Sequence, residues 1–221
     1  MDKKIINSEL LHEIDWIENK TDFSIFEESL RFDVIFRIIK KNNPDFLFDI
    51  GCGSGYLASI IKNWKADIKI HGCDISSTAL ERAKQYCDLT FKVNIDIEDI
   101  PIESDKYNFV VCSEVIEHLF DVKHGLMEIH RILKNKGVAV LTVPNLTYFR
   151  YRWDILRGLL PIPANDERHL HQFTQKSFAR KIEECGLVIF NVSGCRAFLP
   201  WIGDWKPSLF SDTLVFEVCK M

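Results

Sequence analysis

The stretch from Phe46 to Leu57 constrains the fold of this chain more than any other part of the sequence. It reads FLFDIGCGSGYL: a short apolar run that ends in Asp49, three alternate glycines at positions 51, 53 and 55, and the start of a helical pattern. Glycine lets the backbone turn sharply and approach a ligand closely, and the first N–H groups of the following helix have no intrahelical partner. The stretch therefore predicts a strand, a ligand-cradling loop and a helix.

The spacing of the glycines indicates which kind of ligand the loop would hold. The dinucleotide-binding fingerprint is G-x-G-x-x-G and places a pyrophosphate at the start of a helix, whereas this loop is G-x-G-x-G. The carboxylate of Asp49, two residues before the first glycine, favours a ligand with an ammonium group over a pyrophosphate. A tight turn without a ligand is the alternative for a glycine loop taken alone.

An acidic residue followed by G-x-G-x-G resembles the first motif of the class I S-adenosylmethionine-dependent methyltransferases. The resemblance covers roughly residues 24–219. It implies that S-adenosylmethionine is bound by Asp49, Gly51, Cys52, Gly53 and Gly55. An enzyme of this family transfers the methyl group of the cofactor to an acceptor.

Composition is that of an ordinary globular protein. The chain has 221 residues, 47% of them hydrophobic and 27% charged, so it can bury a large core. Lys and Arg number 28 against 32 Asp and Glu, giving a net charge of -4, so no strong nucleic-acid signal is present. We expect one domain over residues 1–221, with an N-terminal helical segment at 1–45 and an inserted cap at 145–172. The expected partner is a small-molecule acceptor.

The cysteines and the N-terminal residues indicate in which cellular compartment the protein is expected. The seven cysteines form no CxxC pair and mostly lie in apolar runs, as small buried hydrophobic residues do. Residues 1–20 do not resemble a signal peptide, and no apolar run approaches the ~20 residues of a membrane helix. The expected location is a reducing cytoplasm.

Apolar runs of strand length alternate with helical patterns along the chain. Strands are expected at about 46–49, 68–73, 89–93, 107–113, 137–143, 187–192 and 213–219, and helices at 24–41, 56–64, 80–87, 125–133 and 174–185. Strands separated by helical crossovers predict an α/β fold with a doubly wound parallel sheet. The resemblance adds an antiparallel C-terminal hairpin that completes a Rossmann-like sheet of seven strands.

Further cofactor-binding residues are expected after the other strands. Asp74 lies about 20 residues beyond the glycines, where an acidic residue accepts hydrogen bonds from ribose hydroxyls in doubly wound folds; a helix N-cap is the alternative. The resemblance places Asp96, five residues before Pro101, at the adenine amino group. Ile97 would offer the base an apolar face and a backbone N–H. The resemblance adds Ile75 and Ser113 to the set.

Residues 107–119 resemble the fourth motif of the family, F-D-x-V-x-x-x-E-V-x-E-H, with Asn108 where aspartate is usual. Transfer to a hydroxyl requires a base, because an alcohol is a poor nucleophile until it loses its proton. His118 follows the fourth strand, and His169 and His171 come from the cap. These three histidines are the candidate bases, and a purely structural role is the alternative for each.

The string E-x-x-E-H also suggests a divalent metal. On a helix, Glu114, Glu117 and His118 would share one face, and His169 could join them. The string resembles that of ubiquinone-pathway O-methyltransferases and of the terminal-ribose methyltransferases of small RNAs, and the latter use it for a metal. It also occurs in metal-free relatives, so no metal is assigned.

The acceptor is suggested only by resemblance. The segments 144–146 and 169–174 resemble methyltransferases encoded with cell-surface polysaccharide enzymes, which suggests a sugar hydroxyl. A quinone precursor or a terminal ribose of RNA, methylated with a divalent metal, is one alternative. A nicotinamide-dependent oxidoreductase and a non-catalytic cofactor-binding module are the others.

Three further features remain open. Arg31 matches an arginine that meets a carboxylate in the family, although a solvated side chain is the expectation here. The cap mixes aromatic residues with Arg150, Arg152 and Arg157, so it could touch a membrane surface or an anionic substrate; a cap whose aromatic residues pack inward is the expectation. Trp201 and Trp205 are a candidate second wall for the substrate.

Overall fold

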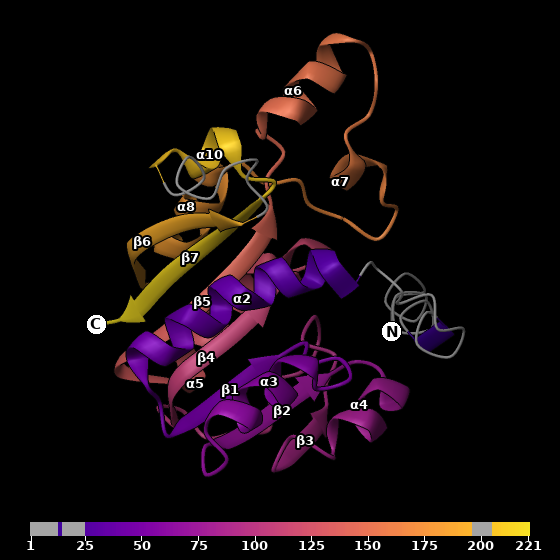
Figure 1. The fold of residues 1–221 in the computed structure, drawn as a ribbon. Helices are drawn as coiled ribbons and strands as arrows, with labels where there is room; N and C mark the ends of the chain where they lie inside the picture. Colours follow the sequence, from indigo (N-terminus) through magenta and orange to yellow (C-terminus); the bar gives the residue numbers. More distant parts are fainter. Residues whose placement is uncertain (1–12, 15–24, 196–204) are drawn as a thin grey trace.

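The computed structural model describes residues 13–14, 25–195 and 205–221 (Figure 1). Its strands are β1 (Phe46–Ile50), β2 (Lys69–Asp74), β3 (Leu89–Lys92), β4 (Tyr107–Ser113), β5 (Leu133–Pro144), β6 (Leu187–Cys195) and β7 (Thr213–Lys220). They form one seven-stranded sheet in the order β3-β2-β1-β4-β5-β7-β6. The strands from β3 to β5 are all parallel, and β7 runs antiparallel to both β5 and β6. The predicted doubly wound, mostly parallel sheet with an antiparallel C-terminal hairpin is confirmed.

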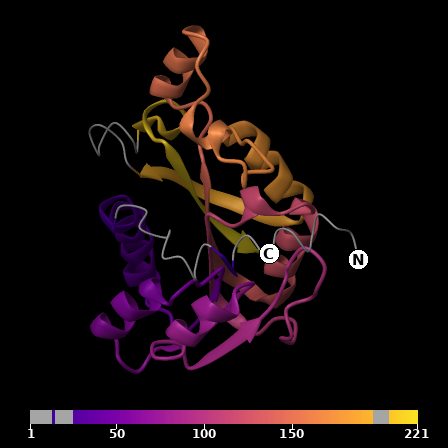
Figure 2. The ribbon, with the colours of Figure 1, turned by 90° about the vertical axis from the view of Figure 1, so that its right-hand side faces the viewer.

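Helices cover both faces of this sheet. They are α2 (Ile25–Asn42), α3 (Tyr56–Trp64), α4 (Ser77–Ala83), α5 (Val122–Ile132), α6 (Phe149–Leu156), α7 (Ile162–Asn165), α8 (Gln175–Glu184) and α10 (Pro207–Phe210), with a 3-10 turn η1 (Ile116–His118). Because side chains alternate along a strand, Phe109 and Val111 of β4 pack with α2 and α3, whereas Val110 and Cys112 pack with α5 and α8. The two halves of the core thus lie on opposite sides of the sheet (Figure 2).

Most element boundaries agree with the expected ones, and the differences have local causes. The helix expected at 80–87 starts at Ser77, because the side chain of Ser76 accepts a hydrogen bond from the N–H of Ala79 and caps the helix. Strand β5 already begins at Leu133, within the stretch expected to be helical, and β6 continues to Cys195. The helix expected at 174–185 is α8, with Thr174 as its N-cap, and Gly186 follows it with a φ of 80°.

The segment after β4 differs from the prediction. Only residues 116–118 form a turn of 3-10 helix, and Glu114 has a φ of 56°, outside any right-handed helix. The prediction that Glu114, Glu117 and His118 share one helical face is therefore wrong. Glu114 takes its position from the strand end instead.

The segment 145–172 holds α6 and α7, and α6 projects away from the sheet (Figures 1 and 2). Inward packing is confirmed for Tyr148 and Tyr151, which are buried, but it is wrong for Phe149 and Trp153, which are 41% and 62% exposed. Of the two candidate tryptophans, Trp201 lies outside the described residues. No helix in the described ranges combines the length and the apolar composition that a bilayer span requires.

Candidate active site

The candidate site lies where the winding of the sheet reverses. From β1 the chain proceeds outward through β2 and β3, then returns to β4 on the other side of β1. Open α/β sheets leave a crevice at the carboxyl ends of the strands at such a point. A cavity of about 440 Å³ lies there. It is lined by the loops after β1, β2, β3 and β4, by residues near the start of α2, and by the segment that carries α7.

The glycine loop depends on glycine at its first turn. Gly51, Gly53 and Gly55 have φ values of 70°, 51° and 79°, a region that other residues rarely adopt. A Cβ atom on Gly51 would lie 2.3 Å from Cγ2 of Val115, so the loop also passes very close to the segment after β4. The predicted strand, loop and helix are therefore present. The backbone at Gly51 lies close to Val115 and also lines the cavity.

Backbone donors of the loop are used to hold it in place. The N–H groups of Gly51 and Cys52 donate to the carbonyl oxygen of Cys73 over 2.8 and 3.0 Å. The N–H of Gly53 donates to Oδ2 of Asp74 over 2.9 Å, and Oδ1 of Asp74 accepts from the N–H of Ser76. Asp74 thus links the glycine loop to the start of α4 while it also lines the cavity.

Carboxylates from three neighbouring strand ends line the cavity. Asp49 is only 4% exposed, and burial together with the nearby Asp74 raises the pKa of Asp49 to about 8. Burial also raises the pKa of Asp96, even though its Oδ1 accepts backbone hydrogen bonds from Phe120 and Asp121. Because a cation beside these carboxyl groups would stabilise their ionised forms, the cavity favours a cationic ligand.

The predicted cofactor residues are mostly brought together. Those that line the cavity are Asp49, Gly51, Cys52, Gly53, Asp74, Ile75, Asp96 and Ser113. Gly55 and Ile97 are not among the lining residues, and the side chain of Ile97 is 41% exposed. The direct contacts that each residue makes with a cofactor remain predictions.

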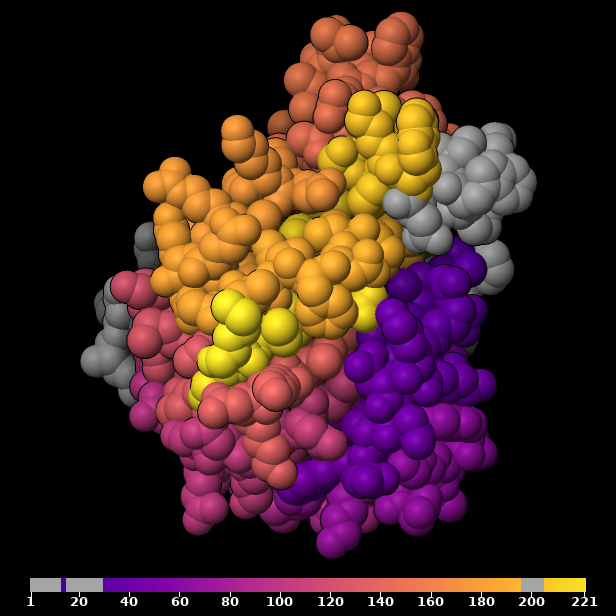
Figure 3. Space-filling model, turned by 90° about the vertical axis from the view of Figure 1, so that its left-hand side faces the viewer, coloured from indigo at the N-terminus to yellow at the C-terminus, as the bar shows by residue number. Residues whose placement is uncertain are grey.

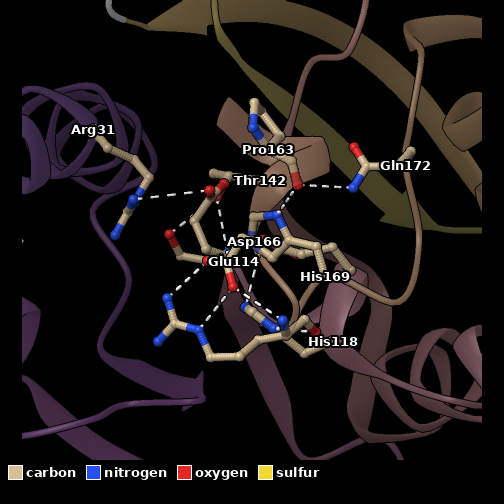
Figure 4. A network of polar contacts seen from close by, with 11 residues as sticks. Arg31, Glu114, His118, Thr142, Pro163, Asp166, His169 and Gln172 are labelled. Carbon is tan, nitrogen blue, oxygen red and sulfur yellow. Dashed lines mark hydrogen bonds and ion pairs between the residues drawn. The ribbon is translucent and has the colours of Figure 1, made fainter. Parts of the chain in front are cut away.

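Two of the three candidate histidines meet at the wall of the cavity. The rings of His118 and His169 have their centroids 4.8 Å apart (Figure 4). Nδ1 of His118 lies 3.0 Å from the carbonyl oxygen of Arg168, and Nδ1 of His169 lies 2.9 Å from that of Pro163. Because a carbonyl can only accept, both neutral rings carry their proton on Nδ1 and a lone pair on Nε2.

His171 occupies a different environment. Its ring stacks on Phe173, with centroids 5.9 Å apart, and its N–H donates to the carbonyl oxygen of Glu117. It is not among the residues that line the cavity. Its backbone therefore supports the segment of Glu117, and its ring lies away from the other two histidines.

Glu117 is the least expected feature of the site. Its side chain is buried, and neither carboxylate oxygen has a hydrogen-bond partner within the described part of the chain. Burial, and to a lesser extent the neighbouring Glu114, raise the pKa of Glu117 well above its ordinary value. One ligand atom each of Glu117, His118 and His169 lies within 4.8 Å of the others. A buried carboxylate beside two imidazoles can hold either a proton or a cation.

Glu114, the remaining candidate metal ligand, has other partners. Its Oε1 accepts a hydrogen bond from the hydroxyl of Thr142, and its Oε2 lies 4.0 Å from Nη1 of Arg31 (Figure 4). The expectation of a solvated Arg31 is wrong, because this side chain is only 15% exposed and lines the cavity. Arg31 and Glu114 form one wall together with the end of β4.

Several lining residues were not predicted. Asp166 accepts two hydrogen bonds from the guanidinium of Arg168, which holds the pKa of Asp166 well below its ordinary range. Tyr151, Ile162 and Pro163 also line the cavity. These residues lie in the irregular segment 145–172, where neither periodicity nor a short motif marks an inward-facing side chain. The one signal for these lining residues is that the segment follows β5 and therefore starts at the edge of the sheet where the cavity lies.

Comparisons with known proteins agree with this geometry. A family described as "Methyltransferase domain" matches residues 26–192. The ubiquinone biosynthesis O-methyltransferase of Rickettsia prowazekii is 27% identical over 152 residues, which are 64% of this chain and 59% of that protein. A SAM-dependent methyltransferase structure from Thermotoga maritima has a TM-score of 0.70 at 17% identity, covering 95% of this chain and 99% of that one. The methyltransferase domain of bacterial CtHen1-CN has a TM-score of 0.60 at 21% identity, covering 87% and 98%.

The family match supports more than the similar structures and the curated relatives do. Both structures are less than 25% identical to this chain, so they support the fold alone. The chain spans only 51 to 62% of the length of the first curated relatives it matches. The family match, in contrast, covers most of the chain.

Proposed function

This chain belongs to the S-adenosylmethionine-dependent methyltransferases, and from this premise we propose that it methylates a hydroxyl group of a small molecule. The observation that carries the proposal is the group of His118, His169 and Glu117 on the cavity wall. A hydroxyl acceptor needs a base, whereas an amine with a lone pair does not. A site built for nitrogen transfer alone would have no need of this group.

The residues at the ends of β1, β2 and β3 fit the cofactor. Asp49 and Asp74 supply carboxylates, Gly51 and Gly53 leave room for close approach, and Asp96 lies at the next strand end. Asp49 would face the ammonium group, Asp74 the ribose hydroxyls and Asp96 the adenine. The bound cofactor supplies an electrophilic methyl group on a sulfonium, which carries most of the chemical difficulty.

The chain's own residues then orient the acceptor and take its proton. Hydrogen bonds to the carbonyl oxygens of Arg168 and Pro163 fix the tautomers of His118 and His169, so a lone pair on Nε2 can accept the hydroxyl proton. Nε2 of His118 lies 4.0 Å from Oε1 of Glu117, so the carboxylate stabilises the imidazolium that forms. Tyr151, Ile162 and Pro163 on the cap side help exclude water from the cavity.

Two acceptor classes fit this chemistry. The name of the Rickettsia relative supports a phenolic hydroxyl of a quinone precursor, and the resemblance of 144–146 and 169–174 supports a sugar hydroxyl. A phenol with a pKa near ~10 is much easier for imidazole to deprotonate than an aliphatic alcohol. We therefore place the phenolic acceptor first.

Release of S-adenosylhomocysteine tests the proposal. The purified chain is incubated with S-adenosylmethionine and, separately, with quinol precursors, nucleotide sugars and primary amines. Turnover with a hydroxyl compound supports the proposal if the His118→Ala variant loses this turnover and still binds the cofactor with the affinity of the wild type. Turnover with amines alone, unaffected by His118→Ala, contradicts the hydroxyl assignment. Calorimetry with S-adenosylhomocysteine and with NAD checks the cofactor, and binding without any turnover would favour a non-catalytic module.

Metal-assisted methylation of a terminal ribose is the second candidate, favoured by the oxygens of Glu117, which have no hydrogen-bond partner among residues 13–14, 25–195 and 205–221. Glu117, His118 and His169 would hold the ion, because a carboxylate and two imidazoles suit several divalent metals. A divalent ion supplies positive charge that stabilises an oxyanion. The test is calorimetric titration of the chelator-treated protein with Mn²⁺ and Co²⁺, with Glu117→Gln as the variant. Absence of binding in the wild type excludes this candidate, and small RNAs added to the acceptor screen test the ribose.

A further inference from the structure

An apolar surface covers the outside of the segment that carries α6 and α7. We name it the cap patch and define it by its exposed apolar residues. They are Phe149, Trp153, Ile155, Leu156, Leu159, Leu160 and Ile162. Leu156, Leu160 and Ile162 are more than 70% exposed, and a Cβ atom on Gly158 would have no heavy atom within 4 Å. Isolated exposed apolar residues are normal on proteins, but a run of seven within 14 positions is not.

The patch continues onto a segment distant in sequence. The ring of Phe149 lies 6.2 Å from that of Phe210 in α10, and Phe210 stacks on Trp205, which is 77% exposed. Trp205 is not a cavity-lining residue, so it serves the outer surface and not the substrate wall that the sequence suggested. The helix α10 lies beside the base of the projecting segment in both the ribbon and the space-filling view (Figures 1 and 3).

The charges around the patch are mostly positive. Arg150, Arg152 and Arg157 are exposed, and Asp154 is the one acidic residue in the same stretch of 14 residues, 149–162. The chain as a whole carries a net charge of -4. A basic segment on an acidic protein, with aromatic and aliphatic side chains between its arginines, has the composition of a surface that lies in the headgroup region of an anionic bilayer.

We propose that the cap patch docks this protein on an anionic membrane surface. The projecting shape supports this occupant, because α6 and its following loop stand clear of the sheet and can enter a bilayer interface without a clash with the rest of the molecule (Figures 1 and 2). In a two-fold dimer built on this patch the arginines of the two copies would face one another, so the positive charges favour anionic lipid over a second copy. Insertion of Trp153, Leu156 and Leu160 supplies the apolar part of the affinity and the arginines supply the rest.

Docking would place the cavity close to the bilayer. Tyr151 and Pro163 line the cavity from the same segment that carries the cap patch, and Ile162 of the patch borders the cavity as well. An amphiphilic acceptor could then pass from the interface to the site with little exposure to water. Only this last consequence rests on the proposed function; the docking itself does not.

The test is co-sedimentation of the full chain with vesicles. Vesicles of phosphatidylcholine alone are compared with vesicles that contain phosphatidylglycerol as an anionic lipid. We expect at least tenfold stronger partitioning onto the anionic vesicles, weakened by added salt. The variant Trp153→Ser with Leu156→Ser and Leu160→Ser should lose at least tenfold of this binding. Arg150→Glu with Arg157→Glu should abolish the preference for anionic lipid.

Controls separate docking from misfolding and from self-association. Met127→Ser with Phe190→Ser removes two residues that are about half exposed elsewhere on the molecule, and it should partition like the wild type. Binding of S-adenosylhomocysteine at unchanged affinity shows that each variant is folded. Equal binding to both vesicles, or a triple variant that sediments like the wild type, overturns the proposal. A wild-type dimer that the triple variant converts to a monomer, without vesicle binding, would assign the patch to a second copy instead.

Discussion

Oε1 of Glu117 lies 4.0 Å from Nε2 of His118, inside a wall where the carboxylate has no hydrogen-bond partner among the described residues. Burying a carboxylate without partners is costly, and this burial raises the pKa of Glu117 well above its ordinary value. Protonation of the imidazole, or arrival of a cation, removes that cost. The ionised form of Glu117 is therefore stabilised when positive charge forms or binds beside it.

The first prediction concerns the variant Glu117→Gln. The amide keeps the shape of the side chain but cannot stabilise an imidazolium, so we expect kcat to fall by about 100-fold or more. The affinity for S-adenosylhomocysteine should stay within about twofold, because Glu117 is not among the residues expected to contact the cofactor. Steady-state kinetics and calorimetry measure the two effects. Glu103→Gln, at an exposed position, is the control; an unchanged kcat in Glu117→Gln would show that the pair has no part in the reaction.

The second prediction compares two glycines that both have positive φ. Gly51 and Gly158 have φ values of 70° and 73°, but a Cβ atom would meet Val115 at 2.3 Å in the first and nothing within 4 Å in the second. Gly158→Ala should cost about 1 kcal/mol of unfolding free energy from backbone strain alone. Gly51→Ala should cost about 2 to 4 kcal/mol, since overpacking adds to the strain. Urea unfolding measures both, and equal costs would contradict the close packing of the loop.

Much of the fold could be predicted because its signals are local. The glycine loop, the strand-length apolar runs and the caps at Ser76 and Thr174 are each specified by a few neighbouring residues. The side-chain period then decides which face each residue occupies, as Phe109 and Val110 show by joining opposite halves of the core. The convergence of Asp49, Asp74 and Asp96 follows from parallel topology, which brings their strand ends to one edge.

Other parts of the site could not be predicted because they depend on contacts distant in sequence. Glu114 leaves the helical pattern since its φ is positive and Thr142, from the neighbouring strand, binds its carboxylate. Arg31 looks like a surface residue in its own helix, and its ion pair with Glu114 forms only because the fold brings α2 beside the end of β4. The outward orientation of Trp153 was missed because aromatic composition alone does not indicate what covers a helix.

The third prediction concerns Asp74, which both anchors Gly53 and lies where the ribose is expected. Asp74→Ala should weaken S-adenosylhomocysteine binding tenfold or more, since each hydrogen bond to a charged acceptor contributes about 1.5 to 3 kcal/mol. Asp67→Ala, at an exposed position, should change nothing. A ligand without the ribose 2′-hydroxyl separates the two roles. The wild type should bind it less tightly than S-adenosylhomocysteine, whereas Asp74→Ala should bind both alike if the carboxylate contacts the ribose.

The fourth prediction is a pH dependence of stability. Asp49 has a pKa of about 8 in the folded protein because of burial, against about 3.9 in an unfolded chain. Below pH ~4 both states are protonated and folding carries no penalty. As the pH rises from about 4 to 8, the unfolded state releases the proton and the folded state retains it, so the folded state without cofactor loses stability. The decrease stops above pH ~8, where both states have lost the proton.

Asp49→Asn should remove this part of the pH dependence. The raised pKa of Glu117 acts in the same direction, so the variant should keep a shallower decrease and not a flat profile. The unfolding free energy of the variant relative to the wild type should increase between pH 5 and 8 by up to about 1.4 kcal/mol per pH unit. Urea midpoints of the cofactor-free proteins at pH 5, 6, 7 and 8 measure the difference. Parallel profiles for the two proteins would show that Asp49 is ionised in the folded state at pH 5, and that the cavity is better solvated than its burial indicates.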